Sequence, residues 1–230
     1  MEDGTLPPAP LKAPRAGAIA GIVFSLLLIV SVVLTRISIP ANPQDAGTWL
    51  SVGWATVNLA LSLLPFAGIA FLWFIGVLRD RLGAREDRFF ATVFLGSGLL
   101  FVGLLFVSSA VAGAVLILYK AAPVKLMESG IYAFGRTVAY QIINVFAMRM
   151  AAVFMVSTCT VSVRTGIFPR WMALLGYALA LLLLLGSGSL YWAPLVFPLW
   201  VLLVSVHILM ANLRAEPASD LGAPARPRKR

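Results

Sequence analysis

Long apolar runs separated by short charged segments constrain this chain more than any other feature of its sequence. Residues 16–35 and 54–78 contain no charged side chain at all. A transmembrane helix needs about 20 apolar residues to cross about 30 Å of hydrocarbon. Both runs reach that length, and all nine acidic residues lie outside such runs. The sequence therefore predicts an all-α, polytopic membrane helix bundle.

The overall composition agrees with this fold class. Of the 230 residues, 60% are hydrophobic and 12% charged, against about 25% charged in soluble domains. Six spans are predicted, at 16–36, 54–78, 89–119, 137–163, 171–186 and 192–213.

The fifth predicted span is short, so we expect it to begin earlier than residue 171, near Ile167. We expect it to form a hairpin with the sixth span through a turn at 186–189.

We expect one six-helix transmembrane domain over residues 15–214, flanked by two disordered tails, 1–14 and 215–230. The first tail holds four prolines, and the second is rich in Pro, Ala and charge. The last five residues carry four positive charges. Such a cluster binds anionic lipid headgroups at roughly 1 kcal/mol per residue near the surface, or it only fixes the topology.

Lys and Arg are unevenly divided between alternate segments. With the N-terminus in the cytoplasm, thirteen of the eighteen basic residues fall in cytoplasmic segments and four outside, while Arg149 lies within a span. Cytoplasmic loops carry the excess of Lys and Arg in membrane proteins. We therefore expect a multi-pass protein of the plasma or inner membrane with both termini in the cytoplasm. The outside residues are Arg36, Lys120, Lys125 and Arg136.

The number and position of the Lys and Arg residues also indicate which partner and which kind of source organism to expect. The net charge of +9 does not predict a nucleic-acid partner, because the basic residues sit where membrane topology places them. The lipid bilayer is the expected partner. Fourteen Arg against four Lys fits a GC-rich bacterial genome.

The fourth span carries the one charge predicted near mid-membrane, Arg149. A charge at the bilayer centre costs about 2.5–3.5 kcal/mol on insertion scales, which makes it a functional candidate. No acidic residue lies in any predicted span to neutralise it. We expect Arg149 to face the protein interior, against polar groups of other helices or an anion. If the helix enters the membrane near Tyr140, the arginine would instead snorkel outward.

The same span shows a polar stripe. At 100° per residue, its polar side chains fall within a sector of about 140°, and Arg149 lies about 80° beyond that sector. Either the stripe makes hydrogen bonds to other helices, or it lines a cavity for an anionic or amphipathic substrate. The candidate substrate-binding residues are Arg136, Tyr140, Gln141, Asn144 and Arg149.

The expected cytoplasmic loop after the second span reads GVLRDRLGAR over residues 76–85. It resembles the G-x-x-x-D-R-x-G-x-R signature of major facilitator transporters, in which charged residues between spans two and three stabilise one gating state. The alternative is a basic connecting loop with local Arg–Asp pairs, and this chain is about half the usual length for that family. The resemblance would assign a gating role to Asp80, Arg81, Gly83 and Arg85.

A second short motif, RTGIFPRW over residues 164–171, joins the fourth and fifth spans. Gly166 is expected to end one helix and Pro169 to start the next, with Trp171 as an interfacial anchor. The pattern resembles a junction in uncharacterised bacterial six-span membrane proteins. That resemblance implies the span count and brings no activity with it.

Pairs of small residues four apart predict places where helix backbones approach closely. Gly17 and Gly21 form one pair, and Ser109 and Gly113 the other. These pairs indicate assembly of the bundle or a homo-oligomer, and not an activity.

Patterns typical of enzymes are missing from the sequence. It contains no G-x-S-x-G, H-E-x-x-H or G-x-x-x-x-G-K-[ST] motif. One cysteine, Cys159, and one histidine, His207, do not suffice for a Cys cage or a multi-His metal site. We expect no catalytic residues, metal or cofactor. The leading interpretation is a small transporter-like protein or an accessory subunit that binds a membrane partner. An intramembrane enzyme is the third alternative.

Overall fold

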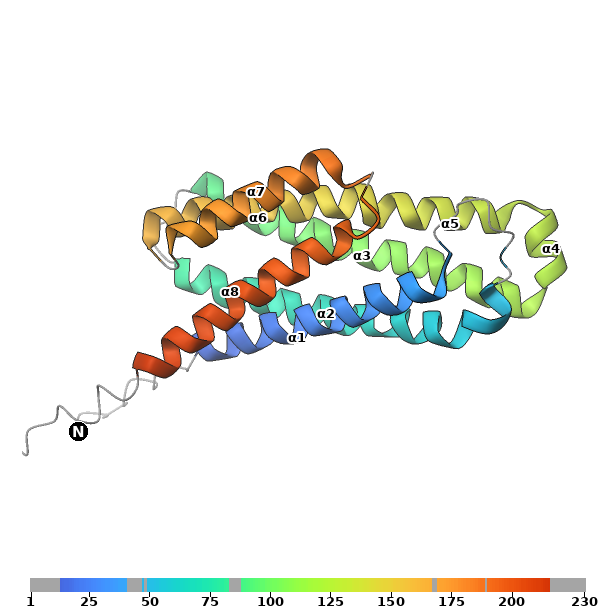
Figure 1. The fold of residues 1–230 in the computed structure, drawn as a ribbon, viewed down its shortest axis with the longest axis horizontal. Coiled ribbons are helices and arrows are strands. Elements are labelled where there is room, and N and C mark those ends of the chain that lie inside the picture. The colour runs from blue at the N-terminus through green and yellow to red at the C-terminus, as the bar shows by residue number, and fades with distance from the viewer. Residues whose placement is uncertain are drawn as a thin grey trace, which may run out of the picture.

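The chain folds into a bundle of helices that run along one long axis (Figure 1). This is a computed structural model, and the residues it describes are all helical or in short connections. The apolar runs become helices because a helix satisfies its own backbone N–H and C=O groups, as hydrocarbon demands. The described residues are 13–40, 47, 49–82, 88–166, 169–188 and 190–215.

The helices form six columns, which confirms the predicted fold class. Within the described residues, five columns are long and apolar enough to cross a membrane, and α7 is apolar but only 17 residues long. The elements are α1 (Ala13–Ser38), α2 (Trp49–Leu82), α3 (Arg88–Ala121), α4 (Pro123–Glu128), α5 (Ile131–Gln141), the π-helix η2 (Ile142–Ala147), α6 (Met148–Thr165), α7 (Arg170–Gly186) and α8 (Ala193–Ala215).

The two ends of the bundle differ. The start of α1 and the end of α8 lie at the same end, here called the terminal end (Figure 1). The opposite end, here called the distal end, carries α4, whereas the turn between α7 and α8 lies nearer the middle of the long axis. At the distal end, α4 and the start of α5 extend beyond the α7–α8 turn (Figure 1). The fourth column is continuous, because α5, η2 and α6 follow one another without a break.

Several predicted boundaries differ from the structure. The second column runs from Trp49 to Leu82, beyond the predicted 54–78 at both ends, so residues 79–82 of the expected loop are helical. The fourth column starts at Ile131, and not at 137. The fifth column, α7, starts at Arg170, and not near Ile167 as expected. Its N-cap residue, Pro169, has an extended conformation (φ −64°, ψ 149°), so the helix begins only after it. Gly166 ends α6 as predicted, with φ +71°, a conformation that favours glycine. Of the predicted disordered tails 1–14 and 215–230, residues 1–12 and 216–230 lie outside the described residues, whereas Ala13, Pro14 and Ala215 are helical.

A cluster of phenylalanine rings, here called the aromatic core, fills the centre of the bundle. Five helices, α1, α2, α3, α6 and α8, contribute to it. At its centre, the Phe71 ring lies 4.5 Å from that of Phe24 and 5.1 Å from that of Phe154, centroid to centroid. The members, all buried, are Phe24, Phe71, Phe74, Phe94, Phe101, Phe154 and Phe197.

Glycines bring the helices of the terminal half close together. A Cβ on Gly21 would lie 2.1 Å from the Ser205 Oγ of α8, and one on Gly17 would meet α2 at a similarly short distance. This pair of small residues therefore mediates close packing, as predicted. The other pair does not: nothing lies within 4 Å of a Cβ on Gly113, and Ser109 lines a cavity.

Candidate functional site

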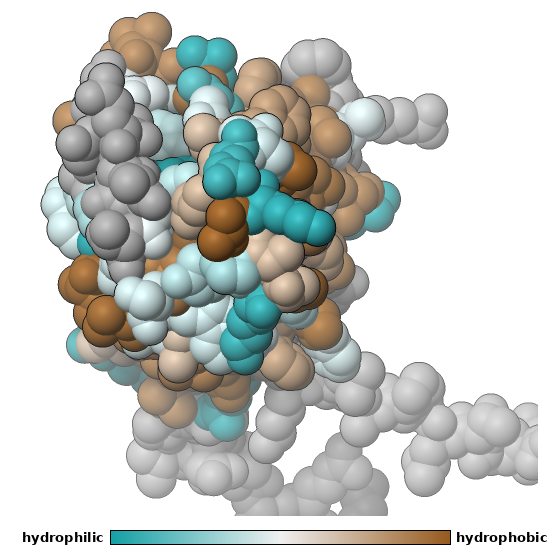
Figure 2. Space-filling view, turned by 90° about the vertical axis from the view of Figure 1, so that its right-hand side faces the viewer, coloured by the Kyte–Doolittle hydropathy of each residue, from teal (hydrophilic) through white to brown (hydrophobic). Residues whose placement is uncertain are grey.

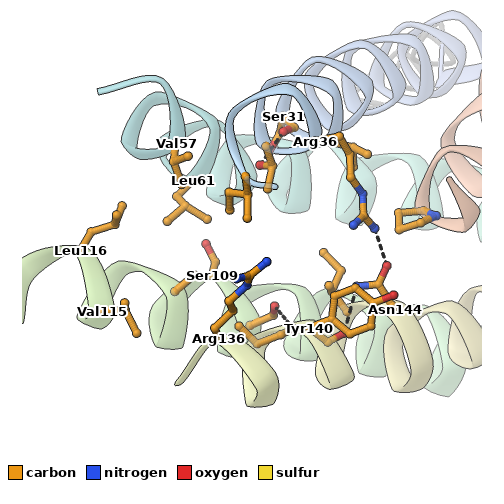
Figure 3. Close-up of a pocket in the computed structure, with 18 of the residues that line it drawn as sticks. Ser31, Arg36, Val57, Leu61, Ser109, Val115, Leu116, Arg136, Tyr140 and Asn144 are labelled. Atoms are coloured by element: carbon orange, nitrogen blue, oxygen red, sulfur yellow. Dashed lines mark hydrogen bonds between the residues drawn. The ribbon is translucent and has the colours of Figure 1, made fainter. Parts of the chain in front are cut away.

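A cavity of about 410 Å³ lies in the distal half of the bundle. In Figure 3, α1 and α2 form one wall, and α3, α5 and η2 form the other. Small-molecule sites have volumes of about 300–1,000 Å³, so this cavity is large enough for a small ligand. Its walls are apolar on α2 and α3, where Val57, Leu61 and Leu116 line it, and polar where α1 faces α5. No acidic residue occurs among its described lining residues.

Arg36, in the last turn of α1, projects into this cavity (Figure 3). Its Nη2 donates a hydrogen bond of 2.5 Å to the Asn144 Oδ1. Its Cζ lies 4.2 Å from the centroid of the Tyr191 ring and 5.9 Å from that of Tyr140, within the range of cation–π attraction. No carboxylate among the described residues pairs with it. The guanidinium is thus held in a fixed orientation while its charge is not neutralised by an acid.

Asn144 and Tyr191 fix this arginine from two sides. Asn144 is 1% exposed, and its Nδ2 donates to the Tyr140 carbonyl oxygen at 3.0 Å. That bond uses the amide nitrogen and leaves Oδ1 to accept from Arg36. The Tyr191 hydroxyl donates to the Arg36 carbonyl oxygen at 3.2 Å, which ties the α7–α8 turn to the end of α1.

The π-helix η2 explains how Asn144 reaches this position. Buried residues on α5 follow helical spacing, from Tyr132 to Gly135 to Ala139, but the next is Asn144, five residues later. In an uninterrupted α-helix, five steps of 100° would place Asn144 about 140° away from Ala139 around the axis. A π-turn accommodates one extra residue and restores the alignment, and such turns occur frequently at functional sites.

The same extra residue corrects the prediction for Arg149. We expected its side chain to face the interior, but it is exposed and does not line the cavity. The prediction assumed 100° per residue along the whole column. One inserted residue rotates everything after η2 by about 100°, which places Arg149 on the side opposite the buried face. No hydrogen bond or ion pair joins it to another described residue.

Arg136 lies on the opposite wall and is tied to the distal end. Its Nη2 donates to the Pro40 carbonyl oxygen at 2.7 Å, and its Nη1 to the Tyr132 hydroxyl at 3.3 Å. The Trp49 Nε1 donates to the same hydroxyl at 2.9 Å. These bonds connect the end of α1, the start of α2 and α5. Figure 2 views the molecule from this end, where hydrophilic side chains gather among hydrophobic ones.

The predicted candidate residues thus divide into two groups. The cavity brings together Arg136, Tyr140, Gln141 and Asn144, but not Arg149. Asn144 is buried as expected, whereas Tyr140 and Gln141 are exposed at the edge of the cavity. Sequence reasoning missed Tyr191, and it interpreted Arg36 only as a charge that sets the topology.

Of the proposed gating residues, the two that the structure describes lie in the part of α2 at the terminal end, away from the cavity. Asp80 and Arg81 belong to the last turns of α2, while Gly83 and Arg85 lie outside the described residues. Their assigned role stays a prediction.

The chemistry of the cavity suits binding of an anion. Its described lining contributes guanidinium groups, hydroxyls and amides. It contributes no carboxylate, imidazole or thiol, and these three groups are common general acids and bases in enzymes. In the part of the chain that the structure describes, no three His, Cys, Asp or Glu side chains gather to hold a metal ion. Comparisons of the chain with protein-family models, with curated proteins and with solved structures find no match.

Proposed function

We propose that this chain is an integral membrane protein that binds an organic anion with an apolar portion, through Arg36, in the cavity of its distal half. One observation carries the proposal: a guanidinium points into a cavity whose described lining holds no acid. Asn144 takes one of the five N–H donors of Arg36. No other described residue accepts a hydrogen bond from this side chain, so the remaining donors face a ligand or water.

The apolar walls favour a ligand that is more than an inorganic ion. Val57, Leu61 and Leu116 line the side of the cavity away from Arg36. A small ion would leave these side chains against water, whereas an apolar group gains roughly 25 cal/mol for each Å² removed from it. An amphipathic anion satisfies both parts of the cavity.

The basic residues favour an orientation with the distal end away from the cytoplasm. Arg79, Arg164, Arg170 and Arg214 all lie at the terminal end, and cytoplasmic ends carry the excess of positive charge. The cavity then faces the non-cytoplasmic side. Fusions of a reporter after residue 84 and after residue 230 should both report cytoplasm, and a fusion near residue 45 should report the outside. A C-terminus outside would contradict this orientation.

The proposal concerns binding, because the aromatic core closes the path toward the terminal end. Phe71, Phe101 and Phe197 are all buried and in mutual contact there. A ligand in the cavity meets these rings before it could pass along the bundle axis. Transport would require this core to open.

The experiment is a thermal-shift measurement on the purified protein with a panel of organic carboxylates and phosphates. A ligand at 100 times its Kd stabilises the folded protein by about 2.7 kcal/mol. We expect that shift in the wild-type protein and in Arg149→Leu, which serves as the matched arginine control, and not in Arg36→Leu. The variant Arg36→Lys keeps the charge but loses the planar fork and should show an intermediate shift. Equal shifts in wild type and Arg36→Leu for every anion would refute the proposal.

A further inference from the structure

We infer that the cavity is filled sideways from the bilayer, through a seam between α1 and α5, and that its ligand is a single-chain lipid with an oxyanion headgroup. This inference rests on the proposed anion site at Arg36 and specifies where its ligand comes from. The helices α1 and α2, α2 and α3, and α3 and α5 pack against each other, whereas α1 and α5 do not pack extensively. Side chains bridge the seam between them, such as Arg136, which donates to the Pro40 carbonyl oxygen.

The side chains at the seam show that it is open. Thr137 and Gln141 line the cavity and are nevertheless exposed, so the cavity reaches the outside of the bundle along this side of α5. Phe134, one turn before Thr137, is 72% exposed, and Ile37, next to Arg36, is 69% exposed. Exposed apolar side chains of this kind on both helices are suited to contact with acyl chains.

The depth of Arg36 matches a lipid headgroup. It lies 21 residues after Arg15 on the same helix, which is about 30 Å at 1.5 Å per residue. That distance equals the thickness of the hydrocarbon core, about 30 Å. With Arg15 at one membrane interface, Arg36 lies at the other. A lipid anion could therefore reach the guanidinium without leaving the depth at which its headgroup already resides.

The size of the cavity limits the lipid to one chain. At about 410 Å³, it lies near the lower end of the range for small-molecule sites. It accepts a headgroup and the first part of one chain along Val57, Leu61 and Leu116, and the rest of that chain can leave through the seam. A two-chain phospholipid does not fit within it.

The surroundings of the guanidinium select the headgroup. The Tyr191 ring lies against it at 4.2 Å, and Asn144 occupies one position at its edge. A ligand therefore approaches the remaining edge, in the plane of the guanidinium. Two adjacent N–H groups on that edge match two oxygens of a carboxylate or phosphate.

The test compares three probes on the full chain in nanodiscs of a zwitterionic lipid, with native mass spectrometry as the readout. Dodecanoate has the chain and the charge, butanoate has the charge with almost no chain, and dodecanol has the chain without the charge. We expect dodecanoate to bind about tenfold or more tightly than either of the others, because two or three buried methylenes, or one charge-assisted hydrogen bond, already give that factor. Arg36→Leu should lose this preference.

Two tryptophan variants test the route. Thr137→Trp places a bulky ring in the seam and should weaken dodecanoate binding about tenfold or more. Ala133→Trp is the matched control, since Ala133 is exposed on the same helix but does not line the cavity, and it should bind as wild type does.

The outcomes separate this inference from the proposed function. If butanoate binds as tightly as dodecanoate and still requires Arg36, the lipid inference is wrong and the anion site stands. If dodecanol binds as tightly as dodecanoate, the headgroup assignment is wrong. If no probe distinguishes wild type from Arg36→Leu, the proposed function falls as well. The comparison of probes on the wild-type chain decides the lipid question even if a tryptophan variant fails to fold.

Discussion

The aromatic core and the distal cavity share α1, α2 and α3 but are built in opposite ways. Around the core, rings from five helices are buried and in contact, and glycines such as Gly21 and Gly98 allow side chains of neighbouring helices to come close. Around the cavity, α1 and α5 separate, and polar side chains such as Arg36 and Asn144 bridge the space. One half is closed and apolar, whereas the other is open and combines apolar walls with polar side chains.

This difference indicates a division of labour along the bundle. Helix association in lipid depends on van der Waals packing and on small residues that let backbones approach, and the aromatic core provides both. A polar cavity adds little packing and costs free energy for partly buried charge. We therefore expect substitutions in the core to change stability and substitutions in the cavity to change binding.

The largest expected effect is on the core. Phe71→Ala removes the ring at its centre and should lower the free energy of unfolding by about 3–5 kcal/mol, toward the lower value because lipid reduces the hydrophobic part of the loss. Unfolding in mixed micelles with increasing denaturing detergent measures this change. Phe66→Ala is the control on the same helix, since Phe66 is 63% exposed, and should change stability by no more than about 0.5 kcal/mol. Similar losses in both variants would show that the core is not the main source of stability.

A smaller loss is expected where α1 meets α8. Gly21→Ala places a methyl group against the Ser205 Oγ and the Phe74 ring, and overpacking of this kind costs about 1–3 kcal/mol. The same unfolding measurement applies. Gly103→Ala, at a position with nothing within 4 Å, should be neutral or stabilising by up to about 1 kcal/mol. If both variants behave alike, the spacing between α1 and α8 is adjustable.

For Arg36 we expect a change of no more than about 1 kcal/mol in the absence of ligand. Arg36→Leu leaves the buried Asn144 Oδ1 without its donor, which is unfavourable, but it also removes the cost of a partly buried charge. These two effects oppose each other. The measurement is the unfolding of the ligand-free variant beside its anion response. A loss above about 3 kcal/mol would identify Arg36 as a structural bridge and would weaken the contrast between the two halves.

The smallest effect is expected at Arg149. Its side chain is exposed on α6 and outside the cavity, so Arg149→Leu removes no described hydrogen bond. We expect a change in stability below about 1 kcal/mol, because an arginine that snorkels avoids most of the cost of mid-membrane charge. The anion-induced thermal shift should be the same as in wild type. A lost shift would return Arg149 to the set of binding residues.

Most of the fold could be predicted from the sequence because hydrocarbon allows few alternatives. The lengths of the apolar runs predict the six columns, and Gly166 and Pro169 predict where α6 ends and α7 begins. The ends of α3 agree with the prediction within two residues, but those of α2 do not, because this helix of 34 residues extends beyond its apolar run at both ends. Charged residues in those extensions resemble loop residues in a hydropathy pattern.

Only part of the candidate site could be predicted, because a charge that follows an apolar run looks the same in the sequence whether or not it lines a cavity. Tyr140 and Asn144 stood out as polar residues within an apolar span. Arg36 did not, because it follows an apolar run at the position of an ordinary interfacial charge, and no sequence pattern links it to a residue 108 positions later. The π-helix η2 carries no signature in its composition, and without it a helical wheel misplaces everything from Asn144 onward.

The shortness of α7 has a consequence for the membrane itself. Its 17 residues span about 25 Å, less than the hydrocarbon thickness of about 30 Å, and α7 packs along α6. A short span is accommodated by local thinning of the bilayer, and such mismatch sorts proteins among membranes of different thickness. Arg149 lies about 22 Å along α6 from Arg164, close to the height at which α7 ends. A bilayer thinned to match α7 would bring phosphates down to this arginine, so a charge that looks costly in a membrane of average thickness would lie at an interface in a thin one.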